Sequence, residues 1–171
     1  MTFGIIVDWY GPYFDLASLK KSAKDYAKGE KVLYMGVSKG NIVNYVGLST
    51  SASSRFDYHH KLSSNQDKFT KYFIGNIESQ GVSGPRPGKQ PRDLKLAEHM
   101  LINVLYPDFN TVSKDGKPQD CGSLYSRFFL ENGEGDYDDG DGKPLPKFPT
   151  FIGYNSYAET YEYSSSITVA N

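Results

Sequence analysis

The amino-acid sequence predicts an α/β (α+β) fold in which short strands and amphipathic helices alternate. Residues 32–47 have the alternation of a β-hairpin on both sides of Lys39-Gly40. Residues 72–77 are predicted to form a strand, and residues 91–107 repeat apolar side chains with the period of a helix. With 171 residues, the chain is long enough for a sizeable core, and we expect one domain with extensions.

The N-terminal residues predict a strand followed by a helix. Residues 3–11 (FGIIVDWYG) are typical of a strand, and Asp15 is placed to cap a helix that ends at Gly29. One face of that helix consists of Leu16, Leu19, Ala23 and Tyr26. We expect this unit to pack on the sheet of the following hairpin, and a role in guiding a substrate is the alternative.

Two tyrosines are the most informative feature of the hairpin. Tyr34 and Tyr45 are eleven residues apart, and a two-residue turn at Lys39-Gly40 predicts that they face each other with Cβ atoms roughly 5 Å apart. The two phenols could then bind one small anionic group together. A three-residue turn would shift the register by one residue and separate the pair. Ordinary sheet packing is the alternative interpretation.

A guanidinium and an imidazole follow the hairpin. The segment SSRFDYHHKL is predicted to begin a helix capped by Ser53 or Ser54, and Arg55 and His59 have the spacing of neighbours on one helix face. Arginine can donate two parallel hydrogen bonds to a phosphate, and histidine can move a proton near neutral pH. A solvated surface helix is the alternative interpretation.

The helix predicted over residues 91–107 carries an acidic side chain beside its apolar face. That face consists of Leu94, Ala97, Leu101, Val104 and Leu105. Glu98 lies between Leu94 and Leu101, where a carboxylate is costly unless a cation or a metal pairs with it. A structural salt bridge is the alternative. Asn110, just past Pro107, could reach back to this carboxylate or to a loop, and plain turn chemistry is its alternative.

The ordered set of these residues resembles the GIY-YIG nuclease family. The matching positions are Val32-Leu33-Tyr34, Tyr45-Val46-Gly47, Arg55, His59, Glu98 and Asn110. The chain departs from the family at Val32, where the family has Gly, and Val has the better strand propensity. The resemblance covers residues 32–110, which is under half of the chain.

The resemblance implies a fold and an activity. It implies a small three-stranded antiparallel sheet flanked by helices over residues 32–110. Residues 1–31 would then be an N-terminal strand–helix extension, and residues 111–171 an acidic, Tyr-rich extension that packs on the core. The activity implied is that of a divalent-metal-dependent endonuclease that hydrolyses DNA, for example a restriction, defence or mobile-element nuclease.

The resemblance also implies a role for each residue of the site. Glu98 would bind one Mg²⁺ or Mn²⁺, which are ions that prefer oxygen ligands. Arg55 would stabilise the charge on the phosphoryl group, and Tyr45 would orient the phosphate. Tyr34 would act as the base or position the attacking water, and His59 would share in proton handling.

Charge is distributed unevenly along a chain whose formal net charge is −1. Residues 54–100 contain eight Lys or Arg and five acidic residues, whereas residues 131–171 contain two and eight. A surface that follows a phosphate backbone is therefore predicted in the first segment. Its basic residues are Arg55, Lys61, Lys68, Lys71, Arg86, Lys89, Arg92 and Lys95. A mixed solvated surface is the alternative, and residues 81–91 are either a DNA-facing loop or a linker.

Location and partners follow from composition. A single cysteine and the absence of a long apolar run predict a cytoplasmic protein that does not enter a membrane. The expected partner is DNA rather than RNA, and a homodimer would be needed to cut both strands at once. A non-catalytic nucleic-acid-binding module is one alternative. The other is a regulatory domain whose acidic C-terminal region contacts a protein.

Overall fold

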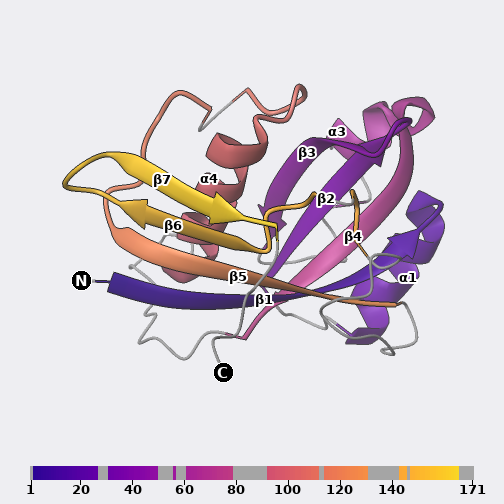
Figure 1. Ribbon diagram of the computed structural model, residues 1–171. Coiled ribbons are helices and arrows are strands. Elements are labelled where there is room, and N and C mark those ends of the chain that lie inside the picture. Colours follow the sequence, from indigo (N-terminus) through magenta and orange to yellow (C-terminus); the bar gives the residue numbers. More distant parts are fainter. Residues whose placement is uncertain are drawn as a thin grey trace.

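The computed structural model describes residues 2–26, 31–49, 56, 61–78, 92–111, 114–130, 143–145 and 147–165. In these parts of the chain, seven strands form one sheet, and helices pack against it (Figure 1). The strands are β1 (Thr2–Tyr13), β2 (Val32–Ser38), β3 (Ile42–Ser49), β4 (Phe69–Ile77), β5 (Cys121–Phe129), β6 (Phe151–Asn155) and β7 (Thr160–Ser164). The helices are α1 (Leu16–Tyr26), α3 (Lys61–Ser64), the 3-10 helix η1 (Gln66–Lys68) and α4 (Arg92–Leu105).

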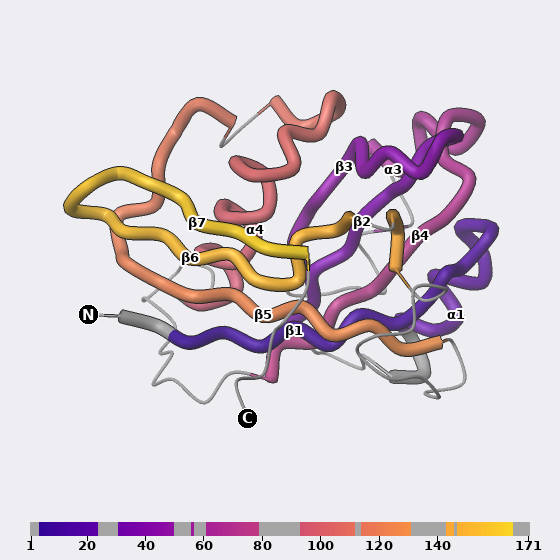
Figure 2. Tube along the Cα trace, in the orientation of Figure 1, coloured from indigo at the N-terminus to yellow at the C-terminus, as the bar shows by residue number. Residues whose placement is uncertain are grey.

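The strand order of the sheet is β3-β2-β4-β1-β5-β6-β7. The β1–β5 pair is parallel and the other pairs are antiparallel. The sheet is curled into a half-barrel, and the chain trace in Figure 2 shows β6 and β7 turning away from the plane of β2 and β4. The prediction of a small three-stranded sheet flanked by helices is therefore wrong. β2, β3 and β4 do pair with one another, but β1 pairs with the other side of β4 and extends the sheet into β5, β6 and β7.

The strand β1 lies in the middle of the sheet, between β4 and β5. Ile5, Val7 and Trp9 point to one face and are fully buried. The indole Nε1 of Trp9 donates to the Ser126 hydroxyl at 3.2 Å, so the one polar atom of this ring is satisfied inside the core. The neighbouring backbone groups are paired by β4 on one side and β5 on the other. The sequence pattern identifies β1 as a strand, and its partners depend on tertiary packing.

The helix α4 fills the concave face of the sheet. Its apolar residues belong to an inner core that also includes side chains from β1, β2, β5 and β6. The members from α4 are Leu94, Leu96, Ala97, Met100, Leu101 and Ile102. The predicted helix and three residues of its predicted core face, Leu94, Ala97 and Leu101, are thus confirmed, while Val104 and Leu105 are only partly buried against this core. Within the described residues, no helix has both the length and the apolar character needed to cross a bilayer.

The helix α1 covers part of the convex face. Leu16, Leu19 and Ala23 are buried there, as the sequence predicts. The Asp15 carboxylate accepts hydrogen bonds from the Ser18 backbone N–H at 2.7 Å and from the Ser18 hydroxyl at 2.9 Å, as a helix cap does. These hydrogen bonds lower the pKa of Asp15. The convex face therefore has a core of its own, which we call the outer core and which includes Tyr34, Tyr45 and Tyr72.

The turn between β2 and β3 has three residues instead of the predicted two. Lys39, Gly40 and Asn41 form it, with φ of 87° at Gly40 and 59° at Asn41. Asparagine tolerates the left-handed conformation that most side chains avoid, and Asn41 therefore extends the turn by one residue. The register shifts again at Val37. Tyr34 consequently pairs with Gly47, and Tyr45 with Gly36, so the prediction that the tyrosines face each other directly is wrong.

Candidate active site

Tyr34 and Tyr45 remain in contact although they are not directly opposite. They are diagonal neighbours on the convex face, and their ring centroids are 5.9 Å apart. The Phe56 ring meets the Tyr34 ring edge-on at 5.1 Å. Tyr34 is 0% exposed and Tyr45 is 9% exposed. The pair therefore belongs to the outer core, and its phenols do not form an open surface patch.

A glycine on β3 makes room for Tyr34. A Cβ atom on Gly47 would lie 2.6 Å from both Cζ and Oη of Tyr34, which is closer than any real contact. The Tyr34 ring therefore lies across the Gly47 backbone. Gly36 has the same role for another ring, because a Cβ there would lie 2.7 Å from Cδ1 of Phe69. The glycine of the Tyr-x-Gly motif thus has a packing reason that is independent of any chemistry.

Asn110 binds the outer edge of β3. Its Oδ1 accepts a hydrogen bond from the Val46 backbone N–H at 2.9 Å, and its Nδ2 donates to the Val46 carbonyl at 2.7 Å. β3 is an edge strand, so these backbone groups have no partner within the sheet. Asn110 is 8% exposed. The prediction placed the Asn110 side chain at the Glu98 carboxylate or at a loop; the structure places it on the backbone of an edge strand, where it supplies to β3 what a further strand would.

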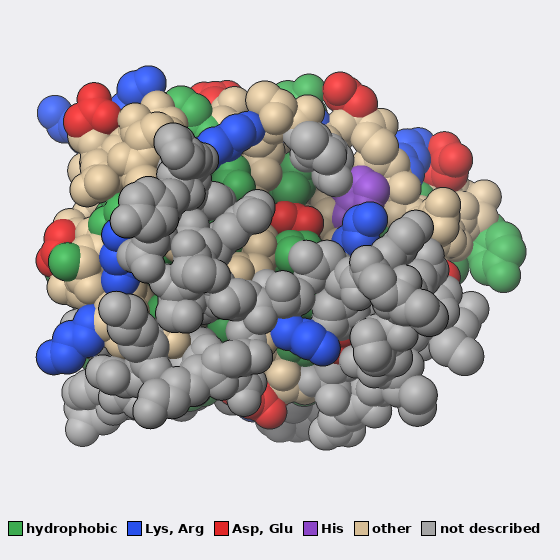
Figure 3. All heavy atoms as spheres, turned by 180° about the vertical axis from the view of Figure 1, so that it is seen from behind, with side chains coloured by type: hydrophobic (Ala, Val, Ile, Leu, Met, Phe, Trp, Pro, Cys, Tyr) green, Lys and Arg blue, Asp and Glu red, His purple; other side chains and the backbone are tan. Residues whose placement is uncertain are grey.

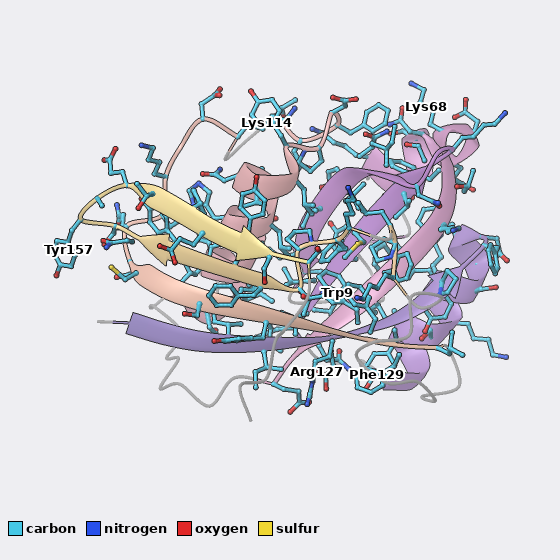
Figure 4. The ribbon with its side chains drawn as sticks, in the orientation of Figure 1. Trp9, Lys68, Lys114, Arg127, Phe129 and Tyr157 are labelled. Atoms are coloured by element: carbon cyan, nitrogen blue, oxygen red, sulfur yellow. The ribbon has the colours of Figure 1, made fainter. Side chains whose placement is uncertain are left out.

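The predicted phosphate-binding lysines Lys61, Lys68 and Lys71 lie near the start of β4 and the end of the β2–β3 hairpin. The Lys61 ammonium donates to the Phe109 carbonyl at 2.6 Å and to the Thr111 hydroxyl at 3.0 Å. The Lys71 ammonium donates to Oδ1 of Asn41 at 2.9 Å. Lys68 is exposed, with its Nζ 5.2 Å from the centroid of the Phe109 ring (Figure 4). Lys61 and Lys71 thus donate hydrogen bonds to protein groups, and Lys68 has the weakest of the three sets of contacts.

Glu98 is half-buried on α4, at the border of the helix face that packs on the inner core. Tyr34 and Tyr45 belong to the outer core, on the opposite face of the sheet. Groups from the two faces can meet without crossing the sheet only at its edge, and α4 contacts the edge strand β3. A site that joins Glu98 to Tyr45 would therefore lie at the outer edge of β3, where Asn110 is bound.

His99 is the neighbour of Glu98 on α4. Its Nε2 lies 2.7 Å from the Gly116 carbonyl oxygen. Burial lowers the pKa of His99, and the positive charge of Lys95 lowers it further, while the hydrogen bond with Gly116 opposes both effects. The neutral imidazole is thus favoured in the folded protein. His99 is not among the site residues predicted from the sequence, because a lone histidine has no distinctive spacing.

Four predicted site residues, Arg55, His59, Arg86 and Lys89, lie outside the described part of the chain. The same holds for the side chain of Arg92, whereas Lys95 is exposed on α4. Figure 3 shows the molecule from behind, and blue basic and red acidic side chains are interspersed on that face. The coloured part of this view contains no extended surface of one charge.

Phe109 and Thr111 lie at the site but were not predicted from the sequence. Phe109 donates its backbone N–H to the Asn44 carbonyl at 2.9 Å. The Phe109 carbonyl and the Thr111 hydroxyl each accept a hydrogen bond from Lys61. The sequence PDFN is typical of an ordinary turn. No spacing signal distinguishes a turn that binds a sheet edge from one that faces solvent.

Comparison with protein-family models, curated proteins and solved structures finds no match for this chain. The assignment of function therefore depends on the residues themselves.

Proposed function

We propose that the chain is a divalent-metal-dependent endonuclease of the GIY-YIG type that acts on DNA. The observation that carries the proposal is the contact between Tyr34 and Tyr45 on one hairpin, with Gly47 making room for the first ring. The amide of Asn110 binds Val46, between Tyr45 and Gly47. Three separate parts of the ordered motif thus meet at one hairpin, and this arrangement supports the proposal.

The proposed chemistry divides among the side chains of the ordered motif. Arg55 would neutralise charge on the scissile phosphate, and His59 would move a proton. Phe56, the residue after Arg55 in the sequence, packs on Tyr34. Tyr45 would orient the phosphate. Tyr34 would position the attacking water or accept its proton, as a phenolate stabilised by a nearby positive charge.

Glu98 is the proposed ligand of Mg²⁺ or Mn²⁺. Among the described residues, no group of three or more His, Cys, Asp or Glu side chains converges, so the ion would keep several water ligands. Magnesium fits such a site, because it is commonly bound through one or two carboxylates and retains much of its hydration. When bound, the ion would supply positive charge to the scissile phosphate and the leaving oxygen.

Plasmid cleavage tests the proposal. Purified protein is incubated with supercoiled DNA and Mg²⁺, Mn²⁺ or EDTA, beside the variants Glu98→Gln and Arg55→Met. We expect metal-dependent cutting that falls by about 100-fold or more in both variants, as loss of a transition-state contact does. Glu162→Gln, an exposed position on β7, is the matched control and is expected to cut normally. Folding of each variant is checked by circular dichroism and thermal unfolding.

A non-catalytic nucleic-acid-binding module is the second candidate, and the burial of Tyr34 favours it. A phenol that is 0% exposed cannot touch a phosphodiester until the groups that cover it move. A binding module requires no such movement. Retention of DNA binding without cutting in any metal would support this candidate and contradict the nuclease. Cutting by the wild type that is lost in Glu98→Gln would exclude it.

We further propose that the protein acts in the cytoplasm, because its single cysteine is suited to a reducing compartment. Cutting both DNA strands at once would require a second copy. Analytical ultracentrifugation with and without DNA tests this point, and a monomer in both conditions would predict nicked rather than linear plasmid.

A further inference from the structure

The segment from Tyr106 to Thr111 runs from the end of α4 along the outer edge of β3. It begins with a strained residue, because Tyr106 has φ of 48° and ends the helix with its backbone N–H bonded to the Ile102 carbonyl at 2.9 Å. A bulky residue rarely adopts this left-handed conformation. The chain then reaches β3 twice, first through the Phe109 N–H and next through the Asn110 side chain.

One ammonium group holds this segment on the side of α3. Lys61 donates to the Phe109 carbonyl and to the Thr111 hydroxyl, and these two residues flank Asn110. Hydrogen bonds from a charged donor are stronger than those between neutral groups. The Phe109 ring adds an edge contact with Phe69 at 5.4 Å. Lys61 therefore binds the residues on both sides of Asn110, one through its backbone carbonyl and the other through its hydroxyl.

We propose that Lys61 is a positioning residue for the proposed site, acting through Asn110 on the edge of β3. The ammonium keeps the segment in place, so that the Asn110 amide stays paired with Val46 and holds the strand on which Tyr45 lies. Two of the three ammonium N–H groups are used in this way. This role rests on the proposed function, and it differs from the predicted role of Lys61 in a surface that binds DNA phosphates.

The structural part of the test measures hydrogen exchange of the Val46 backbone N–H by NMR. In Lys61→Met, which keeps the stem of the side chain and loses its donors, we expect exchange to be about ten-fold faster or more. Lys61→Arg should restore most of the protection, and Thr111→Val, which removes one of the two acceptors, should give an intermediate value. Lys71→Met is the matched control, because its ammonium binds Asn41 at the hairpin turn and should leave Val46 unaffected.

The kinetic part of the test measures kcat and KM, and it distinguishes a residue that positions the site from one that binds DNA phosphates. A positioning residue predicts that Lys61→Met lowers kcat, that KM for DNA and the salt dependence of binding change little, and that Lys61→Arg restores kcat. A phosphate contact predicts instead a higher KM and a salt dependence whose slope falls by about one. A simple loss of global stability would lower the melting temperature without lowering kcat well below that temperature.

The outcomes distinguish this inference from the proposed function. If the wild type cuts no DNA, the proposed function fails, and the exchange of Val46 still decides whether Lys61 holds this edge. If Val46 exchanges at the wild-type rate in Lys61→Met, the inference is overturned whatever the activity. It is also overturned if the active enzyme keeps its kcat in Lys61→Met, or if only KM and the salt slope change.

Discussion

The phenol ring of Tyr34 lies across the backbone of Gly47, its direct partner on the neighbouring strand. Any side chain at position 47 would occupy the space of the ring. This relationship links two residues of the ordered motif through packing alone. It also explains how Tyr34 can be completely buried although it lies next to the edge strand of the sheet.

Gly47→Ala is expected to destabilise the protein by about 1–3 kcal/mol, because the added methyl group overpacks the outer core against Tyr34. Urea unfolding measures the change. Gly4→Ala is the matched control, since a Cβ on Gly4 would meet nothing within 4 Å, and its effect should be small. In a Tyr34→Leu background the cost of Gly47→Ala should fall. Equal costs in both backgrounds would contradict the contact.

Asn110→Leu is expected to lower stability by about 1–3 kcal/mol, because it leaves both the N–H and the carbonyl of Val46 without their partners. Asp108→Ala, at an exposed position of the same segment, should change stability by less than about 0.5 kcal/mol. Chemical denaturation of the two variants side by side makes the comparison. Similar values for both would show that the Asn110 amide does not stabilise the edge of β3.

We expect the titration of His99 to lower the free energy of unfolding as the pH falls. Its pKa is lowered in the folded protein, so the unfolded chain binds its proton first as the pH falls. The contribution is therefore fully present above the ordinary histidine pKa of about 6.5 and is lost as the pH falls through that value toward the lower folded pKa.

The difference in unfolding free energy between the wild type and His99→Gln, measured from pH 8 to pH 5, isolates this effect from the other histidines. The advantage of the wild type should shrink on acidification. A constant difference, or one that grows, would contradict the lowered pKa.

Asp8 and Arg127 form an ion pair with two hydrogen bonds that joins the parallel strands β1 and β5. Variants of these two residues therefore test whether the strands pair. The guanidinium also lies 5.9 Å from the Phe129 ring, and Figure 4 shows Arg127 and Phe129 on the same side of β5. Asp8 is nearly buried and Arg127 is about one quarter exposed. Loss of either side chain leaves the partner's charge poorly solvated.

Asp8→Asn and Arg127→Met are each expected to cost about 2–3 kcal/mol, and the double variant should cost less than their sum. Thermal and urea unfolding of the four proteins complete the cycle. Additive effects would argue against the β1–β5 pairing, and hence against a sheet that extends beyond β1.

The sequence predicted the helices and the hairpin near the proposed site, but it did not predict the register in which β2 and β3 pair. The periodic apolar residues of α1 and α4 and the cap at Asp15 predicted both helices. The hairpin was also predicted, but its turn was one residue too short, because Asn41 accepts the left-handed conformation that continues it. A further shift at Val37 arises where β2 pairs with β3, and no local signal marks it.

The sequence by itself determined β1, the β2–β3 hairpin, β4, the helices α1 and α4, and the ordered set of chemical side chains, since all of these depend on residue type and on spacing along the chain. Only the tertiary structure decided how far the sheet extends and which face each side chain occupies. Distant segments with similar apolar patterns compete as pairing partners for a strand. The partners β1 and β5, for example, are more than 100 residues apart along the chain. For the same reason, only the folded chain could bring Lys61, Asn110 and Val46 together at one edge of the sheet.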